Sequence, residues 1–421
     1  MPAASSTSTP APPPAPASGT FISSVRRSCR VAREAASISI STAAIDAFLL
    51  SLDRATFDRL KTQHGLVFPL QFPNLTAEVN FLAILSLLNT LSGYRSAFHS
   101  ATGSGAYQNV QRLLFGLYLT GGDDAASTAV SGSSHLTAQG LANLSAGTVA
   151  ELLGVSLHEE KKHDKIEAIT VGIRGGPMNE AVELVVGLCN DTGKRLLDAG
   201  YPSLGAFVIE ALKDAERLTA DRGDEAGADK FIEKVVTFLP GFNDAYQLPT
   251  GPVYVFKKAF FLLQALHQRL GSPSSASSSL KVPQTTTTLP MFVDNVLPTM
   301  LVQLGIVDLS SCVVDALKRW GPVETKAQEP GAAEASEGKR EAKDEGPTLT
   351  AAEAYTVRAA CLDAGVEVVK RAKELAKTSA DKAWLDQLNE VDLDGYLWAV
   401  AKDDGALRSV PRMVERNTVM Y

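Results

Sequence analysis

The sequence predicts an all-α protein with a single, mainly helical globular fold. Apolar residues recur at the helical spacing of i, i+3, i+4 and i+7 through most of the chain. Alternating strand patterns are scarce, and the best of them, residues 253–256, is only four residues long. Hydrophobic residues make up 45% and charged residues 21% of the 421 residues, a composition with ample material for a core.

Five stretches show the helical spacing most clearly. The first runs from Ile45 to Leu52, and either Ser41 or Thr42 is placed to cap its N-terminus. The other four lie near residues 110–117, 231–239, 256–267 and 355–369. Because each places its apolar residues on one face, we expect five amphipathic helices that pack on a common core.

Three segments lack the large apolar residues that packing requires, namely residues 1–20, 271–288 and 323–347. The first is rich in Pro, Ala and Ser and predicts a disordered N-terminal tail, and the second predicts a linker or loop. The third mixes acidic and basic side chains with Ala and Gly, which predicts a disordered insertion. Residues 289–322 are too few for a core of their own, so we expect one domain over residues 21–421.

The charge balance excludes some function classes. Forty Lys and Arg residues against 47 Asp and Glu residues give a net charge of −7, which disfavours direct nucleic-acid binding. No uncharged apolar run approaches the roughly 20 residues of a membrane helix, so we expect no membrane span. These features favour the cytoplasm, with the nucleus as an alternative. Four arginines within residues 25–33 make mitochondrial targeting a weaker alternative.

The sequence does not encode a familiar metal site. Its four cysteines form no CxxC pair, which argues against a cysteine zinc site and against a disulfide framework: Cys29, Cys189, Cys312 and Cys361. His158 and His163 are five residues apart, whereas two zinc ligands on one helix face need a spacing of four. We interpret this stretch as a solvated charged turn. No metal and no organic cofactor is expected.

Known phosphate and nucleophile motifs are also missing. Gly103 and Gly105 resemble the start of a GxGxxG loop, but the third glycine and a preceding strand are absent, so we expect a loop that begins a helix. Gly193-Lys194 is followed by Arg195 instead of the Ser or Thr of a P-loop. No GxSxG motif is present, which argues against serine hydrolase chemistry.

Asp294 interrupts a long apolar stretch, since Leu289–Val293 precede it and Met300, Leu301 and Leu304 follow it. A carboxylate in such surroundings must be paired, cap a helix, or take part in a reaction. A structural explanation is available, because Asp294 could cap a helix whose first turn contains Pro298. Both interpretations stay open at this point.

Asp394 and Trp398 form the second unusual pair. On a helix, residues at i and i+4 share a face, so a carboxyl group and an indole would line one wall. This combination suits a flat heterocyclic base, which stacks on the indole and hydrogen-bonds to the carboxyl group. The alternative is that Asp394 caps the helix and Trp398 belongs to the core.

Two long segments carry a resemblance to a known family. Residues 289–310 read LPMFVDNVLPTMLVQLGIVDLS, and residues 391–404 read VDLDGYLWAVAKDD. Both resemble motifs of the queuosine salvage family, enzymes that hydrolyse the N-glycosidic bond of queuosine 5′-phosphate and release queuine for tRNA modification. Shorter similarities follow in chain order, so that the resemblance extends over about residues 25–421: VRRSCRVAREA, NFLAILSLLN, NDTG, VYVFKKAFFL and VRAAC.

The resemblance implies a helical fold related to DNA glycosylases, with a small-molecule nucleotide as substrate and no cofactor. Asp294 matches the catalytic aspartate, Asp394 and Trp398 match the base-binding residues, and Phe292 matches an aromatic residue of the pocket. Four positions depart from the family's Tyr, Arg, Gln and Asp: Asn295, Val296, Thr299 and Ala399.

The expected chemistry follows from the bond that breaks. Loss of the base develops oxocarbenium charge on the ribose, which the Asp294 carboxylate would stabilise or use to orient water. Lys257 or Lys258 is the candidate to bind the 5′-phosphate, although a lysine pair in an amphipathic helix is more commonly a solvated edge. The competing hypotheses are a helical ligand-binding protein without catalysis and a scaffold whose insertion recruits partners.

Overall fold

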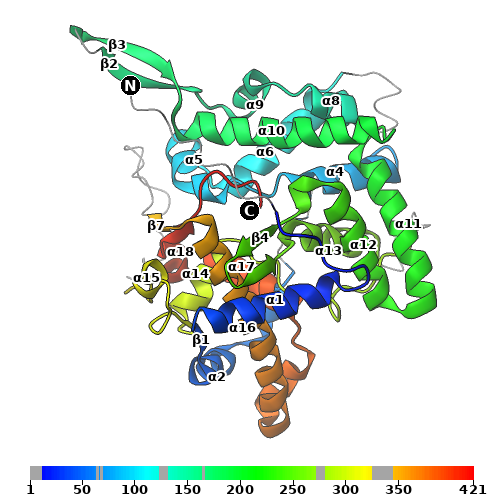
Figure 1. Ribbon diagram of the computed structural model, residues 1–421, viewed down its shortest axis with the longest axis vertical. Coiled ribbons are helices and arrows are strands. Elements are labelled where there is room, and N and C mark those ends of the chain that lie inside the picture. The colour runs from blue at the N-terminus through cyan, green and yellow to red at the C-terminus, as the bar shows by residue number, and fades with distance from the viewer. Residues whose placement is uncertain are drawn as a thin grey trace.

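Helices account for most of the computed structural model (Figure 1), which confirms the predicted all-α class. The structure describes residues 12–62, 66, 70–122, 131–163, 166–271, 280–324 and 345–421. The helices of the first part are α1 (Phe21–Ala35), α2 (Thr42–Ser51), α3 (Arg54–Leu60), α4 (Leu75–Leu87), η1 (Ser92–Tyr94), α5 (Arg95–Thr102), α6 (Ala106–Thr120), η2 (Ser134–Leu136), α8 (Ala138–Ala142) and α9 (Ala146–Leu153). Those of the second part are α10 (Gly176–Asp198), α11 (Leu204–Arg222), α12 (Asp224–Phe238), η3 (Pro240–Phe242), α13 (Lys257–Leu270), α14 (Val296–Gln303), α15 (Asp315–Lys318), α16 (Ala351–Thr378), η4 (Ala380–Gln387), α17 (Glu390–Asp403) and α18 (Gly405–Ser409).

The five predicted amphipathic helices are α2, α6, α12, α13 and α16. Ser41 caps α2, because its hydroxyl accepts a hydrogen bond from the Ala44 N–H at 3.2 Å. A capping box begins α16, where Thr350 and Glu353 exchange hydrogen bonds. Local sequence signals therefore explain where these two helices start.

The strands are short and form two-stranded sheets. Three sheets are antiparallel and one is parallel: β1 (Ser39–Ile40) with β6 (Val307–Asp308), β2 (His158–His163) with β3 (Ile166–Arg174), β4 (Ala245–Leu248) with β5 (Gly251–Tyr254), and β7 (Glu345–Thr348) with β8 (Arg412–Val414). The predicted strand 253–256 corresponds to β5, which ends at Tyr254. It ends there because Phe256 adopts a left-handed conformation, φ 49°, and α13 begins at the next residue.

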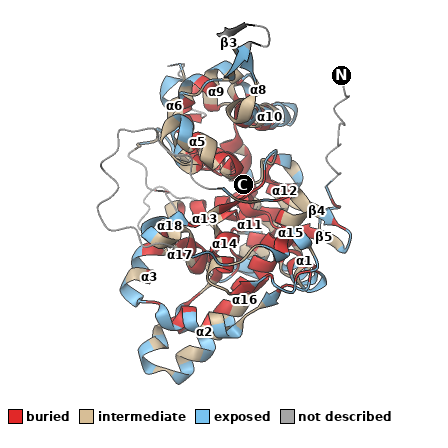
Figure 2. Ribbon diagram, turned by 90° about the vertical axis from the view of Figure 1, so that its left-hand side faces the viewer, coloured by how far each residue is buried: buried red, intermediate tan, exposed pale blue. Residues whose placement is uncertain are grey.

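The helices form two groups that meet at α4. In Figures 1 and 2, α5, α6 and α8–α10 make up one group, and α13, α14, α16 and α17 belong to the other. Helix α4 packs on α6, α11 and α13 and is buried from Ala77 to Leu87. Its Asn80 donates hydrogen bonds to the carbonyls of Ser131 and Leu136 and accepts one from the Gly205 N–H. This buried amide joins α4 to η2 and α11.

The prediction of a disordered tail over residues 1–20 is wrong for residues 12–20. Residues 1–11 lie outside the described part, but residues 12–20 lie against the fold. Pro13 is buried, the Tyr254 hydroxyl donates a 2.7 Å hydrogen bond to the Pro14 carbonyl, and Ser18 donates one to Glu233 at 2.8 Å. Proline rings and backbone carbonyls supply these contacts, so the segment packs without large apolar residues.

Helix α1 packs on α16 through a face that includes Phe21, Val25 and Cys29. Three of its arginines form ion pairs with later helices. Arg26 pairs with Glu390, and Arg30 and Arg33 both contact Asp363. The basic stretch at residues 25–33 thus belongs to the folded structure.

The described residues of the other two low-complexity segments belong to the folded structure. The predicted link 271–288 is described from residue 280, and there Leu280 and Thr285 are buried, which corrects the expectation that this segment does not pack. The predicted insertion 323–347 lies outside the described residues from 325 to 344. Its last residues, from Glu345, form β7, which pairs with β8 of the C-terminal segment.

Candidate active site

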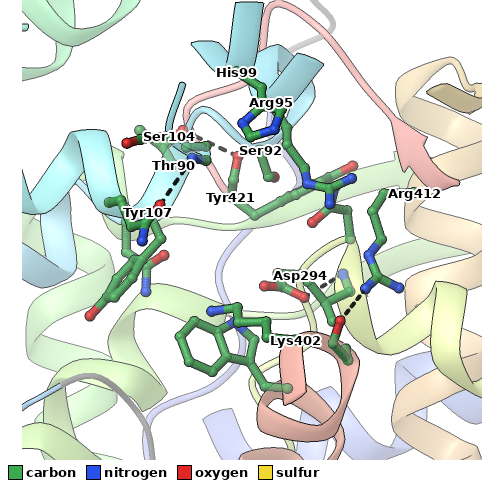
Figure 3. A pocket seen from close by; sticks show the side chains of 18 of the residues that line it. Thr90, Ser92, Arg95, His99, Ser104, Tyr107, Asp294, Lys402, Arg412 and Tyr421 are labelled. Carbon is green, nitrogen blue, oxygen red and sulfur yellow. Dashed lines mark hydrogen bonds between the residues drawn. The ribbon is translucent and has the colours of Figure 1, made fainter. Parts of the chain in front are cut away.

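A cavity of about 640 Å³ lies between the two helix groups and is the candidate site (Figure 3). Its walls come from the segment joining α4 to α6, the start of α13, the residues before α14, and α17–β8. Residues that line it include Asn89, Ser92, Arg95, His99, Tyr107, Lys257, Asp294, Trp398, Lys402, Arg408, Arg412 and Tyr421.

A smaller inner pocket of about 20 Å³ adjoins this cavity. All five residues proposed from the sequence line it, and three further side chains complete it: Phe292, Asp294, Asp394, Trp398 and Lys257, with Asn89, Tyr107 and Phe261. Asp294, Trp398 and Lys257 also face the larger cavity. The folded chain therefore brings together the five proposed side chains, which come from three separate segments of the sequence.

Asp294, which precedes the N-cap residue Asn295, binds the first N–H groups of α14 and faces the cavity at the same time. Its Oδ1 accepts hydrogen bonds from the N–H groups of Val296 and Leu297, at 2.7 and 3.4 Å. Within the described residues, Oδ2 accepts none. Asp294 is 8% exposed. The two interpretations of this carboxylate are thus compatible, because one oxygen holds the helix and the other remains for a ligand.

Asp394 does not cap its helix, which excludes that alternative. Asn389 caps α17 by accepting the Asp392 N–H at 2.9 Å. Asp394 lies one turn further on, 4% exposed, and its Oδ2 accepts the Phe292 N–H at 2.7 Å. Burial, and secondly the charge of Asp294, raise the pKa of Asp394 to about 8. We therefore expect the carboxyl group to hold a proton at neutral pH, in which form it can donate a hydrogen bond.

Trp398 faces both cavities and is half-buried. Tyr107 meets its ring edge-on, with ring centroids 5.4 Å apart. Tyr107 belongs to the first turn of α6, just after the loop at Gly103 and Gly105, so the expected helix-start loop is confirmed. The Lys402 side-chain nitrogen lies against the face of the Trp398 ring, and burial lowers the pKa of Lys402 to about 7. The indole face can therefore hold a cationic or flat group.

Lys257 and Lys258 are buried, which corrects the interpretation of this pair as a solvated edge. The Lys257 ammonium donates to the backbone and side-chain oxygens of Asn89 at 2.9 and 2.8 Å, and Lys258 donates to the Leu87 carbonyl at 2.8 Å. Burial lowers the pKa of Lys257 to about 8, against the opposing influence of Asp294. Only Lys257 reaches the cavity.

A group of arginines in the cavity wall was missed by the sequence analysis. Arg95, Arg408 and Arg412 line the cavity, and we call them the cationic wall. Burial, and secondly the charge of Arg408, lower the pKa of Arg95. Within the described residues, the Arg95 and Arg408 side chains form no hydrogen bond or ion pair. The Asp294 carboxylate also lines the cavity and acts on Arg412, whereas the Arg95 guanidinium is left without an acidic partner among the described residues and is the candidate contact for an anion.

Two neighbours complete this wall. His99 lies one helical turn after Arg95, and this spacing of four residues was the available sequence signal. The Ser92 hydroxyl, which also lines the cavity, is buried and has no hydrogen-bond partner within the described part of the chain. Arg412 is anchored, since its Nη2 donates to the carbonyls of Ala401 and Leu407 at 2.8 and 3.3 Å.

The remaining motifs lie away from the cavity. Residues 158–163 form strand β2, which corrects the predicted charged turn. The stretch is extended because it pairs with β3 in an antiparallel hairpin. Gly193 and Lys194 lie inside α10. The described residues contain no cluster of three metal-ligating side chains, and the four cysteines are free and buried.

No protein-family model matches the chain, and no curated protein sequence matches it. Among the described helices, none is long and apolar enough to cross a membrane alone. The bent pair formed by α4 and the segment Ser92–Thr102 meets the length and composition criteria, although α4 is a core helix.

Proposed function

We propose that this protein is a nucleotide N-glycosidase that hydrolyses queuosine 5′-phosphate and releases queuine. The observation that carries the proposal is the position of Asp294. Its carboxylate lies where the inner pocket, with its indole and protonated carboxyl group, opens into the cavity with the cationic wall. The inner pocket has room for about one water molecule, so the base would lie in the larger cavity against Trp398, with its edge at the mouth of the inner pocket and the ribose and phosphate towards the cationic wall.

In the proposed complex the base stacks on Trp398, where it replaces the Lys402 side chain, and its edge meets Asp394. The Asp394 carboxyl group is protonated at neutral pH and donates a hydrogen bond to the departing base. This hydrogen bond stabilises the negative charge that develops on the base as the C1′–N bond breaks. The phosphate binds at Arg95 and its neighbours in the cationic wall. Lys257, held by Asn89, lies by the two carboxyl groups instead of at the phosphate.

Asp294 supplies the electrostatic part of the reaction. As the C1′–N bond breaks, positive charge develops on the ribose, and the carboxylate stabilises it. Water then forms the new C1′–O bond and loses one proton, while the departing base keeps the electron pair of the broken C1′–N bond and takes up one proton, so that one water is consumed for each bond broken. The α14 N–H groups hold Oδ1, so the carboxylate is oriented before the substrate binds.

The test is release of queuine from queuosine 5′-phosphate by the purified protein, measured by chromatography. We expect Asp294→Asn to keep the fold, since Asn is an equally good cap, and to lower turnover by about 10² to 10⁴. Asp53→Asn is the control, because the Asp53 carboxylate also stabilises the start of a helix, α3, by accepting the Thr56 N–H at 2.8 Å, and it does not line the cavity. Its turnover should equal that of the wild type.

Two results would contradict the proposal. Equal turnover in Asp294→Asn and wild type would remove Asp294 from the reaction. Binding of queuosine 5′-phosphate without any release of queuine by the wild type would favour the non-catalytic binding protein.

A further inference from the structure

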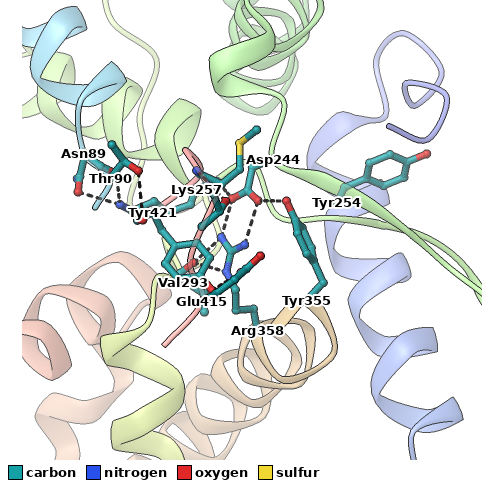
Figure 4. Close-up of polar contacts among 12 residues, drawn as sticks. Asn89, Thr90, Asp244, Tyr254, Lys257, Val293, Tyr355, Arg358, Glu415 and Tyr421 are labelled. Atoms are coloured by element: carbon teal, nitrogen blue, oxygen red, sulfur yellow. Dashed lines mark hydrogen bonds and ion pairs between the residues drawn. The ribbon is translucent and has the colours of Figure 1, made fainter. Parts of the chain in front are cut away.

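A fully buried ion pair lies behind the candidate active site (Figure 4). Arg358 of α16 and Asp244, which precedes β4, are both 0% exposed. The Arg358 Nη1 and Nη2 atoms donate to the two carboxylate oxygens of Asp244 at 3.0 and 2.6 Å. Neither residue lines the cavity or the inner pocket.

Arg358 holds the backbone next to Asp294. Its Nε and Nη2 atoms donate to the Val293 carbonyl at 3.1 and 2.9 Å, and Val293 directly precedes Asp294. Arg358 therefore holds the peptide group that precedes Asp294, and the first N–H groups of α14 hold the Asp294 carboxylate itself.

Asp244 holds the other segment of the site. Its Oδ2 accepts the Lys257 N–H at 3.2 Å, and its backbone carbonyl accepts the N–H groups of Val255 and Phe256 at 2.9 and 3.1 Å. These bonds stabilise the turn in which Phe256 has positive φ and from which α13 starts. One ion pair thus holds the chain at both Asp294 and Lys257.

Aromatic residues enclose the pair. The Tyr355 hydroxyl donates to Asp244 at 2.6 Å, and the Tyr421 ring lies 4.3 Å from the Arg358 guanidinium carbon. Tyr421 also lines the cavity, so it separates the ion pair from any ligand. A buried ion pair is generally no more stabilising than packed apolar residues, so its value must be sought in the geometry that it imposes.

We propose that Arg358 and Asp244 are positioning residues that set the separation of Asp294 and Lys257 across the inner pocket. The inference rests on the proposed function and deepens it. Loss of this geometry would move the Asp294 carboxylate relative to C1′ while leaving the aromatic and cationic walls in place. The rate of the chemical step would fall, and substrate binding would change little.

Arg358→Lys tests this inference, because lysine keeps the charge but cannot make all four hydrogen bonds at once. We expect kcat for queuine release to fall about 10²-fold, with KM within about threefold of wild type. Measurements at a temperature where each variant is fully folded separate this loss from instability. Arg33→Lys is the control, since Arg33 also pairs with a buried carboxylate of α16, Asp363, and neither residue lines the cavity or the inner pocket. Its kcat should stay unchanged.

The outcomes separate the inference from the function on which it rests. Unchanged kcat in folded Arg358→Lys, with an active wild type, would refute the positioning role alone. An inactive wild type would refute the proposed function and the inference with it. If Arg358→Lys does not fold, Tyr355→Phe takes its place, because it removes one hydrogen bond to Asp244 and keeps the aromatic ring. A several-fold loss of kcat in Tyr355→Phe would support the inference. A wild-type kcat in this variant would overturn it.

Discussion

The Asp394 carboxyl group makes the stability of this protein depend on pH in a way that one substitution should remove. Its pKa is about 8 in the folded protein and 3.8 when exposed, mainly because burial disfavours the charged form. Between these values the folded protein holds a proton that the unfolded chain releases. The unfolded state therefore binds fewer protons, and the free energy of unfolding falls as the pH rises.

The magnitude follows from the size of the pKa shift. Each pH unit in this window costs about 1.4 kcal/mol, so between pH 5 and pH 8 the wild type should lose about 3 to 4 kcal/mol through this group. Asp394→Asn cannot ionise, and its amide oxygen can still accept the Phe292 N–H. We expect the variant to lack this loss, so that the difference between the two proteins grows steadily with pH.

Urea unfolding at pH 5, 6, 7 and 8, followed by circular dichroism, measures the effect. Asp392→Asn is the control on the same helix, since Asp392 is only partly buried and pairs with Lys61 on the surface. It should retain the wild-type pH dependence. A parallel pH dependence in wild type and Asp394→Asn would show that Asp394 is ionised in the folded protein, and would refute both its protonation and its proposed role as a hydrogen-bond donor.

Three further predictions concern the ligand and the N-terminal segment. Trp398→Ala should weaken queuine binding by roughly 10-fold or more in calorimetry, and Trp398→Phe should retain most of the affinity; equal binding by Trp398→Ala would exclude stacking on this ring. Arg95→Gln should raise KM for queuosine 5′-phosphate about 10- to 100-fold and leave KM for the nucleoside unchanged, whereas equal effects on both would place the phosphate elsewhere. Deletion of residues 1–20 should cost ~1 to 2 kcal/mol more than deletion of residues 1–11, because only the longer deletion removes the contacts of Pro13 and Pro14; equal denaturation midpoints would show that those contacts contribute nothing.

Much of the candidate site could be anticipated from the order of residues. Asp294 could be selected because a carboxylate in an apolar stretch must be paired, cap a helix or take part in a reaction. Asp394 and Trp398 could be selected because their spacing places them on one helix face. The five proposed residues do line one inner pocket. The proposed chemistry at that pocket remains a prediction that the turnover assays test.

The sequence determined the helical class, the positions of five helices and the cap of α2 at Ser41, because periodicity and capping act between residues close together in the chain. The burial of Lys257, the protonation of Asp394 and the gathering of Arg95 with Arg408 and Arg412 were decided by tertiary structure. Each depends on which helices pack against one another and how much water they exclude. Burial sets the pKa of a charged group, and neither burial nor the distance between charges on separate helices is contained in any local pattern.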